Sequence, residues 1–263
     1  MIRLARLVFG IAVGVLELLM VYAFICMLPT WLPAQEARYH PASDAAAIAL
    51  VQRHERSTGA ARPPAQQHFI IEMKVGTNAP IRTETWIAEP HRILSRTEVG
   101  GRLVMEFGFD GTTGWSNSPM TGPVRLPTSQ LEILRASAGG MAAPSIDSTR
   151  PLRATGQRTF DGQLVEGVRV ITATGDTAES FYSVSTGLLA GMRMRAQGAI
   201  VLGGAPGDSI VLLLRDYKQI GGRTGSMTMI YRGMGMESEA RTVHLDYEPI
   251  DPVRFKPPAG LPR

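Results

Sequence analysis

Segments in which apolar and polar residues alternate recur along this chain, and they constrain its fold more than any other feature. In FIIEMKV, one side of an extended chain carries Phe69, Ile71, Met73 and Val75, and the other carries Glu72 and Lys74. A period of two is typical of a β-strand with one buried face. The same pattern predicts inward residues in two further segments: Leu103, Met105, Phe107 and Phe109 in RLVMEFGF, and Leu188, Ala190, Met192, Met194 and Ala196 in GLLAGMRMRAQ.

Turn motifs lie between these segments, among them FDGTTG, FDGQ, STG and GGRTG. Their close spacing favours a meander of antiparallel strands over alternating strands and helices. Two segments have helical features instead. In residues 43–59, Ser43 can act as the N-cap, Asp44 favours the positive end of the helix, and Gly59 stops it. In residues 127–140, Thr128 or Ser129 can cap a second helix.

The expected order is therefore a helix, about four strands, a helix and then about six strands, in one domain over residues 41–263. A sheet of about ten strands curls, and two short helices cannot fill its concave face. We therefore predict a mainly β fold: a strongly curved antiparallel sheet, or incomplete barrel, covered by short helices and preceded by an N-terminal hydrophobic helix.

Residues 1–37 predict export. Arg3 and Arg6 precede an apolar run from Leu7 to Leu28 whose one ionisable residue is Glu17. This run is long enough for a spanning helix, whereas LPAQEA offers small-residue cleavage sites at residues 34 and 37. A cleaved signal peptide and a retained signal anchor both remain open. Either one places the rest of the chain outside the cytoplasm.

Composition and motifs exclude several classes of function. The chain has 27 basic and 23 acidic residues and no concentrated basic run, so we expect no nucleic-acid partner. Its one cysteine, Cys26, lies in the apolar run, which leaves no internal disulfide and no thiolate zinc site. The chain has no G-x-S-x-G motif, and RHERS is not H-E-x-x-H. We expect no enzyme activity, no cofactor and no metal site.

Methionine is concentrated on the predicted strands. The segment SMTMIYRGMGM contains Met227, Met229, Met234 and Met236. Flexible thioethers suit a wall that accepts acyl chains of varied shape, but they also fill closed cores. As a third alternative, the M-x-M pairs at 192/194, 227/229 and 234/236 could bind Cu(I), because residues two apart on a strand point the same way.

Trp115 has two interpretations: it lies at the rim of a cavity, or it pins a turn to the core. The candidate lipid-contact residues are Phe69, Ile71, Met73, Leu103, Met105, Phe107, Trp115, Met192, Met194, Met227 and Met229.

Several segments, taken in order, resemble the LolA/LolB-like periplasmic lipoprotein-carrier superfamily. They are AAAIALVQRHERSTG before a strand, FGFDGTTGWSNSPM, TFDGQLVEGVRVITA, ESFYSVSTGLLAGMRM, DYKQIGG and the closing IDPVRFKPPAG. The resemblance implies an incomplete barrel around an apolar cavity, and a periplasmic carrier or sensor of lipid or lipoprotein. The implied partners are an acyl lipid or lipoprotein and the inner or outer membrane surface, with the protein acting as a monomer in the periplasm or on the periplasmic face of the inner membrane.

Two details of this resemblance concern particular residues. Arg82, Arg92 and Arg96 are candidates for the arginine that helps to hold the lid helices in carriers of this family. Ser185 stands where an acidic residue is common in the family.

Overall fold

The computed structural model describes residues 39–59, 64–75, 79–89, 91–127, 148–171, 177–195, 209–233 and 236–261. These residues form one α-helix, thirteen strands and one 3-10 helix. In chain order they are α2 (Ala45–Thr58), β1 (Gln66–Val75), β2 (Ile81–Ala88), β3 (Arg92–Val99), β4 (Arg102–Phe109), β5 (Gly114–Ser118), β6 (Gly122–Arg125), β7 (Arg153–Phe160), β8 (Gln163–Ile171), β9 (Thr177–Ser183), β10 (Leu189–Arg195), β11 (Ser209–Ile220), β12 (Arg223–Gly233), β13 (Met236–Asp246) and η1 (Pro252–Phe255).

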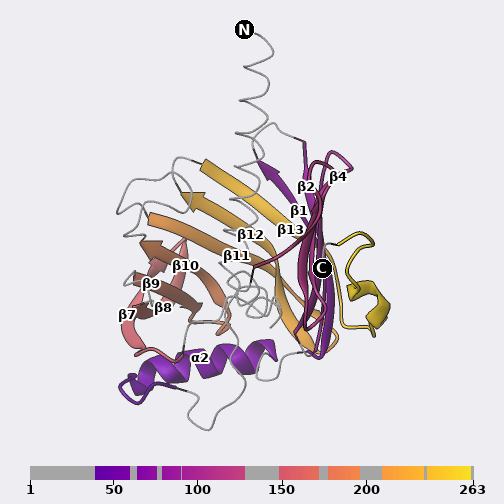
Figure 1. Cartoon of the computed structure of the whole chain (residues 1–263). Helices are drawn as coiled ribbons and strands as arrows, with labels where there is room; N and C mark the ends of the chain where they lie inside the picture. The colour runs from indigo at the N-terminus through magenta and orange to yellow at the C-terminus, as the bar shows by residue number, and fades with distance from the viewer. Residues whose placement is uncertain are drawn as a thin grey trace.

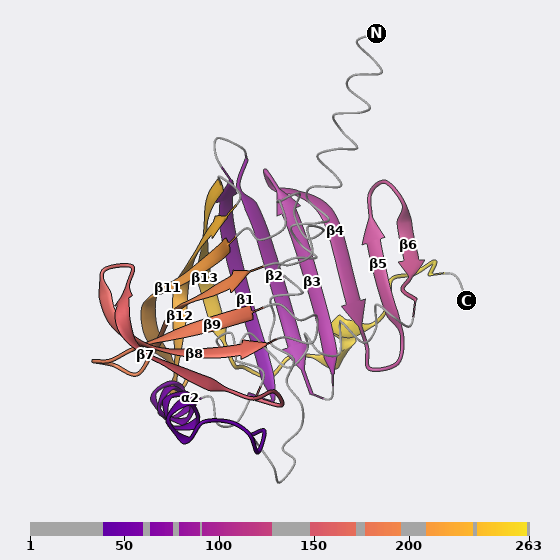
Figure 2. The same ribbon diagram turned by 90° about the vertical axis from the view of Figure 1, so that its left-hand side faces the viewer.

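All thirteen strands belong to one antiparallel sheet, in the order β6-β5-β4-β3-β2-β1-β13-β12-β11-β10-β9-β8-β7. The first and last strands of the chain, β1 and β13, pair in the interior of the sheet, where Phe69 lies opposite Leu245. Among the strands that the structure describes, the edge strands β6 and β7 have no partner on their outer sides, so the sheet is open. The sheet bends strongly, as Figures 1 and 2 show. The prediction of a mainly antiparallel β fold is confirmed.

The number of strands differs from the prediction. Six strands precede residue 127 and seven follow residue 148, where about four and about six were expected. The short hairpin of β5 and β6 is the clearest cause, because GWSNS and GPVR contain little apolar alternation. Strand pairing with the neighbouring β4, and not sequence pattern, holds this hairpin in the sheet.

The helix α2 ends as predicted, but its first turn differs. Gly59 adopts the left-handed conformation with φ +68° and closes the C-terminus. Asp44 is the N-cap residue, yet its side chain makes no capping hydrogen bond. Its carboxylate accepts from the Ala154 amide at 3.0 Å, and the Ser43 hydroxyl accepts from the Leu152 amide at 3.0 Å. The expected capping side chains therefore attach the start of the helix to the start of β7.

The sheet has two apolar faces. We call the face that α2 packs against the inner face. It carries two clusters of buried side chains: the first contains Ala47 and Val51 of α2 together with Val168, Tyr182 and Leu212, and the second contains Phe69, Ile71, Ile93, Phe107 and Phe109. The outer face carries a cluster around Phe181 and another in which Phe255 of η1 covers Trp86, Leu94 and Trp115.

Some sequence expectations lie outside the described residues. The signal peptide or anchor over residues 1–37 is one, and most of the second predicted helix, residues 127–140, is another. Among the described residues, no helix is long and apolar enough to cross a membrane.

Candidate functional site

The inner face of the sheet is the candidate site, because its two apolar clusters meet. Met229 on β12 packs against both clusters. Its cross-strand neighbours are Leu214 of the first cluster and Ala240 of the second. The apolar surface therefore extends from the strands beneath α2 to β1. Figure 1 shows α2 next to β7, β8 and β9.

The predicted contact residues on this face divide into two groups by exposure. Phe69, Ile71 and Phe107 are buried and form the floor of the second cluster. The methionines are only partly buried. Met73 packs against the second cluster, Met192 and Met194 pack against the first, and Met229 packs against both.

Two further predicted methionines are also partly buried. Met105 lies opposite Thr97 on the inner face of β3 and β4. Met227 lies on β12 two residues before Met229 and belongs to neither cluster. The sequence therefore predicted the apolar alternation well, but it did not separate the buried floor from the partly exposed methionines.

Leu103 is not on the inner face. A bulge in the β3–β4 pair shifts the register between Thr97 and Glu98, so that Met105 pairs with Thr97 but Leu103 pairs with Glu98. One extra residue in a strand turns the residues beyond it to the opposite side. Leu103 therefore shares the outer face with Glu98 and is 37% exposed. The prediction that it joins Met105 on one apolar face is wrong.

Trp115 is buried on the outer face of the sheet, on the side opposite the candidate site. It is 1% exposed and packs with Phe255 and Trp86. Its ring lies directly over Gly108, where an added Cβ would come within 2.5 Å of Trp115 Cζ2. The interpretation in which Trp115 pins β5 to the core agrees with this position.

A line of hydroxyl groups crosses the inner face and was missed by the sequence analysis. The Thr85 and Ser95 hydroxyls lie 3.0 Å apart, and those of Thr83 and Thr97 lie 3.4 Å apart. Thr85, Ser95 and Thr97 are buried. The alternation of Thr83, Thr85 and Ile87 along β2 is the sequence signal that places these polar groups on the apolar side. They provide hydrogen-bonding groups beside the apolar floor.

The three arginines proposed from the family resemblance all have partners on the outer face. Arg82 binds Glu72 at 3.0 Å, and Arg96 binds Glu106. Arg92 donates to the Glu89 carbonyl and lies over the Phe255 ring. Strand alternation explains this, because these residues alternate with the inner-face hydroxyl residues of β2 and β3.

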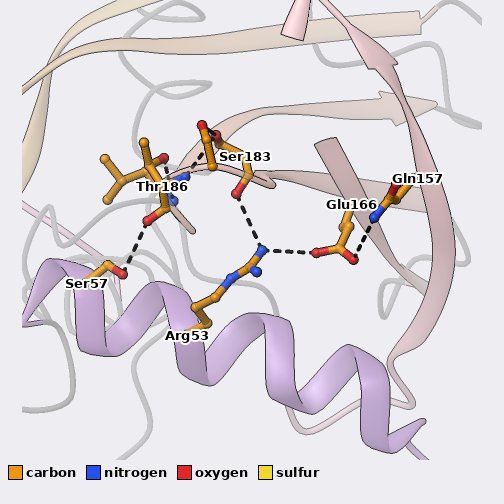
Figure 3. Close-up of polar contacts among 8 residues, drawn as sticks. Arg53, Ser57, Gln157, Glu166, Ser183 and Thr186 are labelled. Carbon is orange, nitrogen blue, oxygen red and sulfur yellow. Dashed lines mark hydrogen bonds and ion pairs between the residues drawn. The ribbon is translucent and has the colours of Figure 1, made fainter. Parts of the chain in front are cut away.

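An arginine of α2 faces the inner side of the sheet instead. Arg53 Nη2 donates to Glu166 Oε2 of β8 at 3.0 Å and to the Ser183 carbonyl at 3.4 Å (Figure 3). Ser57 donates to the carbonyl of Thr186 at 3.5 Å. We call this set of contacts the α2 latch. It attaches the helix to β8 and to the turn between β9 and β10.

The turn under the latch depends on a glycine. Gly187 has φ +73°, and an added Cβ would lie 3.0 Å from the Arg53 side chain. Ser185 donates to or accepts from the Ser183 hydroxyl at 3.0 Å, within the same turn. Ser185, which stands where an acidic residue is common in the family, therefore stabilises the turn through this hydrogen bond.

His54 is buried between α2 and the sheet. Its Nδ1 accepts from the Leu189 amide at 3.2 Å, and its ring lies 5.5 Å from that of Tyr182. Burial lowers the pKa of His54 to about 4, although a backbone hydrogen bond at Gly187 opposes the shift. The neutral imidazole is therefore the form that joins α2 to the sheet at neutral pH.

Possible metal ligands are distributed over both faces. The pairs Met192/Met194 and Met227/Met229 lie on β10 and β12, which β11 separates. Met234 and the side chain of Met236 lie outside the described residues. Among the described histidines and carboxylates, His68, His244 and Asp246 bring three ligand atoms together on the outer face. The expectation of no metal site is therefore open to a test, which is developed below.

Comparisons with solved structures support the fold. A LolA superfamily protein from Nitrosomonas europaea superposes with a TM-score of 0.51 at 12% sequence identity, covering 80% of this chain and 97% of that one. A DUF1329 family protein from Desulfovibrio piger gives a TM-score of 0.52 at 11% identity, with coverage of 80% and 97%. No protein-family profile and no curated protein sequence matches the chain. The chain thus has the fold of LolA superfamily proteins, and the predicted resemblance is confirmed at the level of the fold.

Proposed function

We propose that this protein is a non-catalytic envelope protein that binds an acyl lipid or a lipid-modified protein on the inner face of its sheet. The observation that carries the proposal is the position of the methionines. Met73, Met192, Met194 and Met229 are partly exposed around a floor of buried aromatic and branched side chains. Methionine side chains are unbranched and polarizable. At partly exposed positions on an apolar surface they can therefore adjust to guests of different shape.

The energetic case rests on the area that a guest could cover. Each methylene buried is worth about 0.8 kcal/mol, so a chain of some ten buried methylenes gains on the order of 8 kcal/mol before ordering costs. The hydroxyl of Thr83 is partly exposed and lies beside the apolar floor. It could bind a polar headgroup, which would orient the guest.

The proposal includes the absence of catalysis and an extracytoplasmic location. The buried hydroxyls of Thr85 and Ser95 bond to each other, an arrangement that differs from a nucleophile paired with a base. Export is supported by the basic and apolar pattern of residues 1–37. A cleaved signal would fit a diffusing monomeric carrier, and a retained anchor would fit a sensor or acceptor at the inner membrane.

Native mass spectrometry tests this function most directly. The chain is expressed from its first residue, purified from the envelope fraction without detergent, and examined for an added mass that fragments as an acyl lipid. Displacement of a fluorescent fatty acid then measures affinity. We expect Met229→Gln to weaken binding about tenfold, because a polar amide replaces a thioether that contacts both clusters.

Met120→Gln is the matched control, since Met120 lies in the β5–β6 turn and is 93% exposed. A bare mass together with no displacement by either protein would reject lipid binding. A bare mass that takes up about one Cu(I) on titration would instead support the methionine pairs as metal ligands.

A further inference from the structure

Three neighbouring strands bring two histidines and two carboxylates together on the outer face, opposite the lipid-binding candidate. His68 comes from β1, Glu84 from β2, and His244 and Asp246 from β13. His68 pairs directly with Asp246, while His244 and Glu84 flank Ile70. One ligand atom from each of His68, His244 and Asp246 lies within 4.8 Å of the other two.

Each imidazole of this cluster contacts a carboxylate. His68 Nδ1 lies 3.2 Å from Asp246 Oδ2, and His68 Nε2 lies 2.9 Å from Glu84 Oε1. His244 Nε2 lies 2.6 Å from the same Asp246 oxygen. A neutral imidazole has only one N–H group. Both nitrogens of His68 face carboxylate oxygens, and a neutral His68 can donate to only one of them. A metal ion between Nδ1 and Asp246 would satisfy the other contact.

The surroundings of His68 resemble those of a metal ligand. Metal-binding histidines usually donate the second ring nitrogen to a carboxylate, which fixes the ring and its tautomer. Glu84 can accept that bond from Nε2, which leaves Nδ1 facing Asp246 and the His244 ring. The Trp86 ring stacks on His68 at a centroid distance of 5.0 Å and an interplanar angle of 1°. His68 is therefore held in one orientation before any ion binds.

A β-bulge aligns the other two ligands. The register of β1 and β13 shifts between Ile70 and Ile71, which pair with His244 and Thr242 and leave Val243 as the extra residue. Without this extra residue, strand alternation would turn His244 and Asp246 toward the inner face. Bulges are frequent where a strand redirects a functional side chain. This bulge places both residues on the face of His68.

The Asp246 carboxylate is held in place by its neighbours. Its Oδ1 accepts a hydrogen bond from the Glu248 amide at 3.1 Å, while its Oδ2 faces both imidazoles. Two cations lie on this part of the outer face. Arg96 stands opposite Glu84 on β3 and pairs with Glu106, and the Arg254 guanidinium lies 4.4 Å from the centre of the Trp86 ring.

We propose that His68 Nδ1, His244 Nε2 and Asp246 bind a divalent transition-metal ion such as Zn²⁺, with Glu84 fixing His68 from behind. Two imidazoles and one carboxylate are the ligands that Zn²⁺, Ni²⁺ and Cu²⁺ accept, whereas Mg²⁺ and Ca²⁺ prefer oxygen ligands alone. Three protein ligands leave the fourth position of a tetrahedral ion for water or for a group of a partner. The site lies on the opposite face from the proposed lipid surface and does not depend on it.

The test is a Zn²⁺ titration of the metal-free full-length protein in competition with a chromophoric chelator at neutral pH. We expect about one tightly bound Zn²⁺ per chain. His244→Ala and Asp246→Asn each remove a ligand, and each should weaken binding at least tenfold. Glu84→Gln should weaken it less, because this change leaves all three ligands in place.

His91→Asn is the control, since His91 is exposed, lies outside the cluster and has φ 60°, which asparagine tolerates. This variant should bind Zn²⁺ like the wild type. Circular dichroism verifies that each variant is folded, and His244 is exposed enough (45%) for its replacement to leave the core intact. Wild-type protein that binds no Zn²⁺ below about 0.1 mM, or binding that survives both His244→Ala and Asp246→Asn, would overturn the proposal.

Discussion

Protonation of His54 should lower the free energy of unfolding, because the neutral form of this side chain joins α2 to the sheet. Burial depresses the pKa of His54 from its ordinary value of 6.5 to about 4 in the folded protein. Between these values the unfolded chain binds a proton that the folded chain does not, so stability falls as the pH falls through this window. The complete shift corresponds to about 3 kcal/mol, of which about 2 kcal/mol is lost by pH 5.

The local geometry explains the penalty. In the folded protein, His54 Nδ1 accepts a hydrogen bond from the buried Leu189 amide. A proton on Nδ1 would remove that acceptor and leave the Leu189 amide without its hydrogen-bond partner. Asp44 and Asp246 also have lowered pKa values, but as carboxylates they titrate below this window.

Urea unfolding at about pH 7.5 and about pH 5 measures the effect. We expect the wild type to lose about 2 kcal/mol more between these pH values than His54→Gln, whose side-chain amide cannot take up a proton. His91→Asn should keep the wild-type pH dependence, because His91 is exposed. Equal losses in the wild type and in His54→Gln would refute the argument that burial of His54 links α2 docking to pH.

Glycine substitutions test the packing on the two faces of the sheet, Gly108→Ala on the outer face and Gly187→Ala on the inner face. Gly108→Ala should destabilise the protein by about 1–3 kcal/mol in urea unfolding, because the new Cβ would lie 2.5 Å from the buried Trp115 ring; an unchanged midpoint would contradict this packing. Gly187→Ala should cost more than Gly222→Ala. Both have φ above +70°, but only at Gly187 would the Cβ also press on Arg53, at 3.0 Å. Equal losses in these two variants would show that the α2 latch does not depend on the turn.

Period-two alternation predicted the antiparallel sheet and the inner-face positions of Phe69, Ile71, Met73 and Phe107, because a strand with one buried face has little freedom to place its apolar residues otherwise. The errors arise where an extra residue interrupts a strand. Bulges at the β3–β4, β9–β10 and β1–β13 pairs reverse the faces of the residues beyond them. Leu103 was assigned to the wrong face for this reason.

Long-range packing accounts for the remaining differences. Trp115 was open to two interpretations because its burial depends on Phe255, far away in the sequence. The same holds for the α2 latch, in which Arg53 meets Glu166, and for the outer-face cluster of His68 and Asp246. A local pattern contains no information about which distant segment covers a residue. The division between buried floor and half-exposed methionines is likewise set by the bend of the complete sheet.

The pairing of β1 with β13 has a consequence for how the chain folds. The strands β1 to β6 form a meander of neighbours in sequence, and so do β7 to β13. Among the described residues, the strand pairing that joins the two meanders is that of β1 with β13, so this contact must wait until nearly the whole chain has been synthesised. Until then the second edge of β1 has unpaired backbone groups that can pair with other chains. A nascent or truncated chain that lacks residues 236–246 should therefore be prone to aggregation, and refolding of the complete chain should be slow because its decisive contact spans most of the sequence.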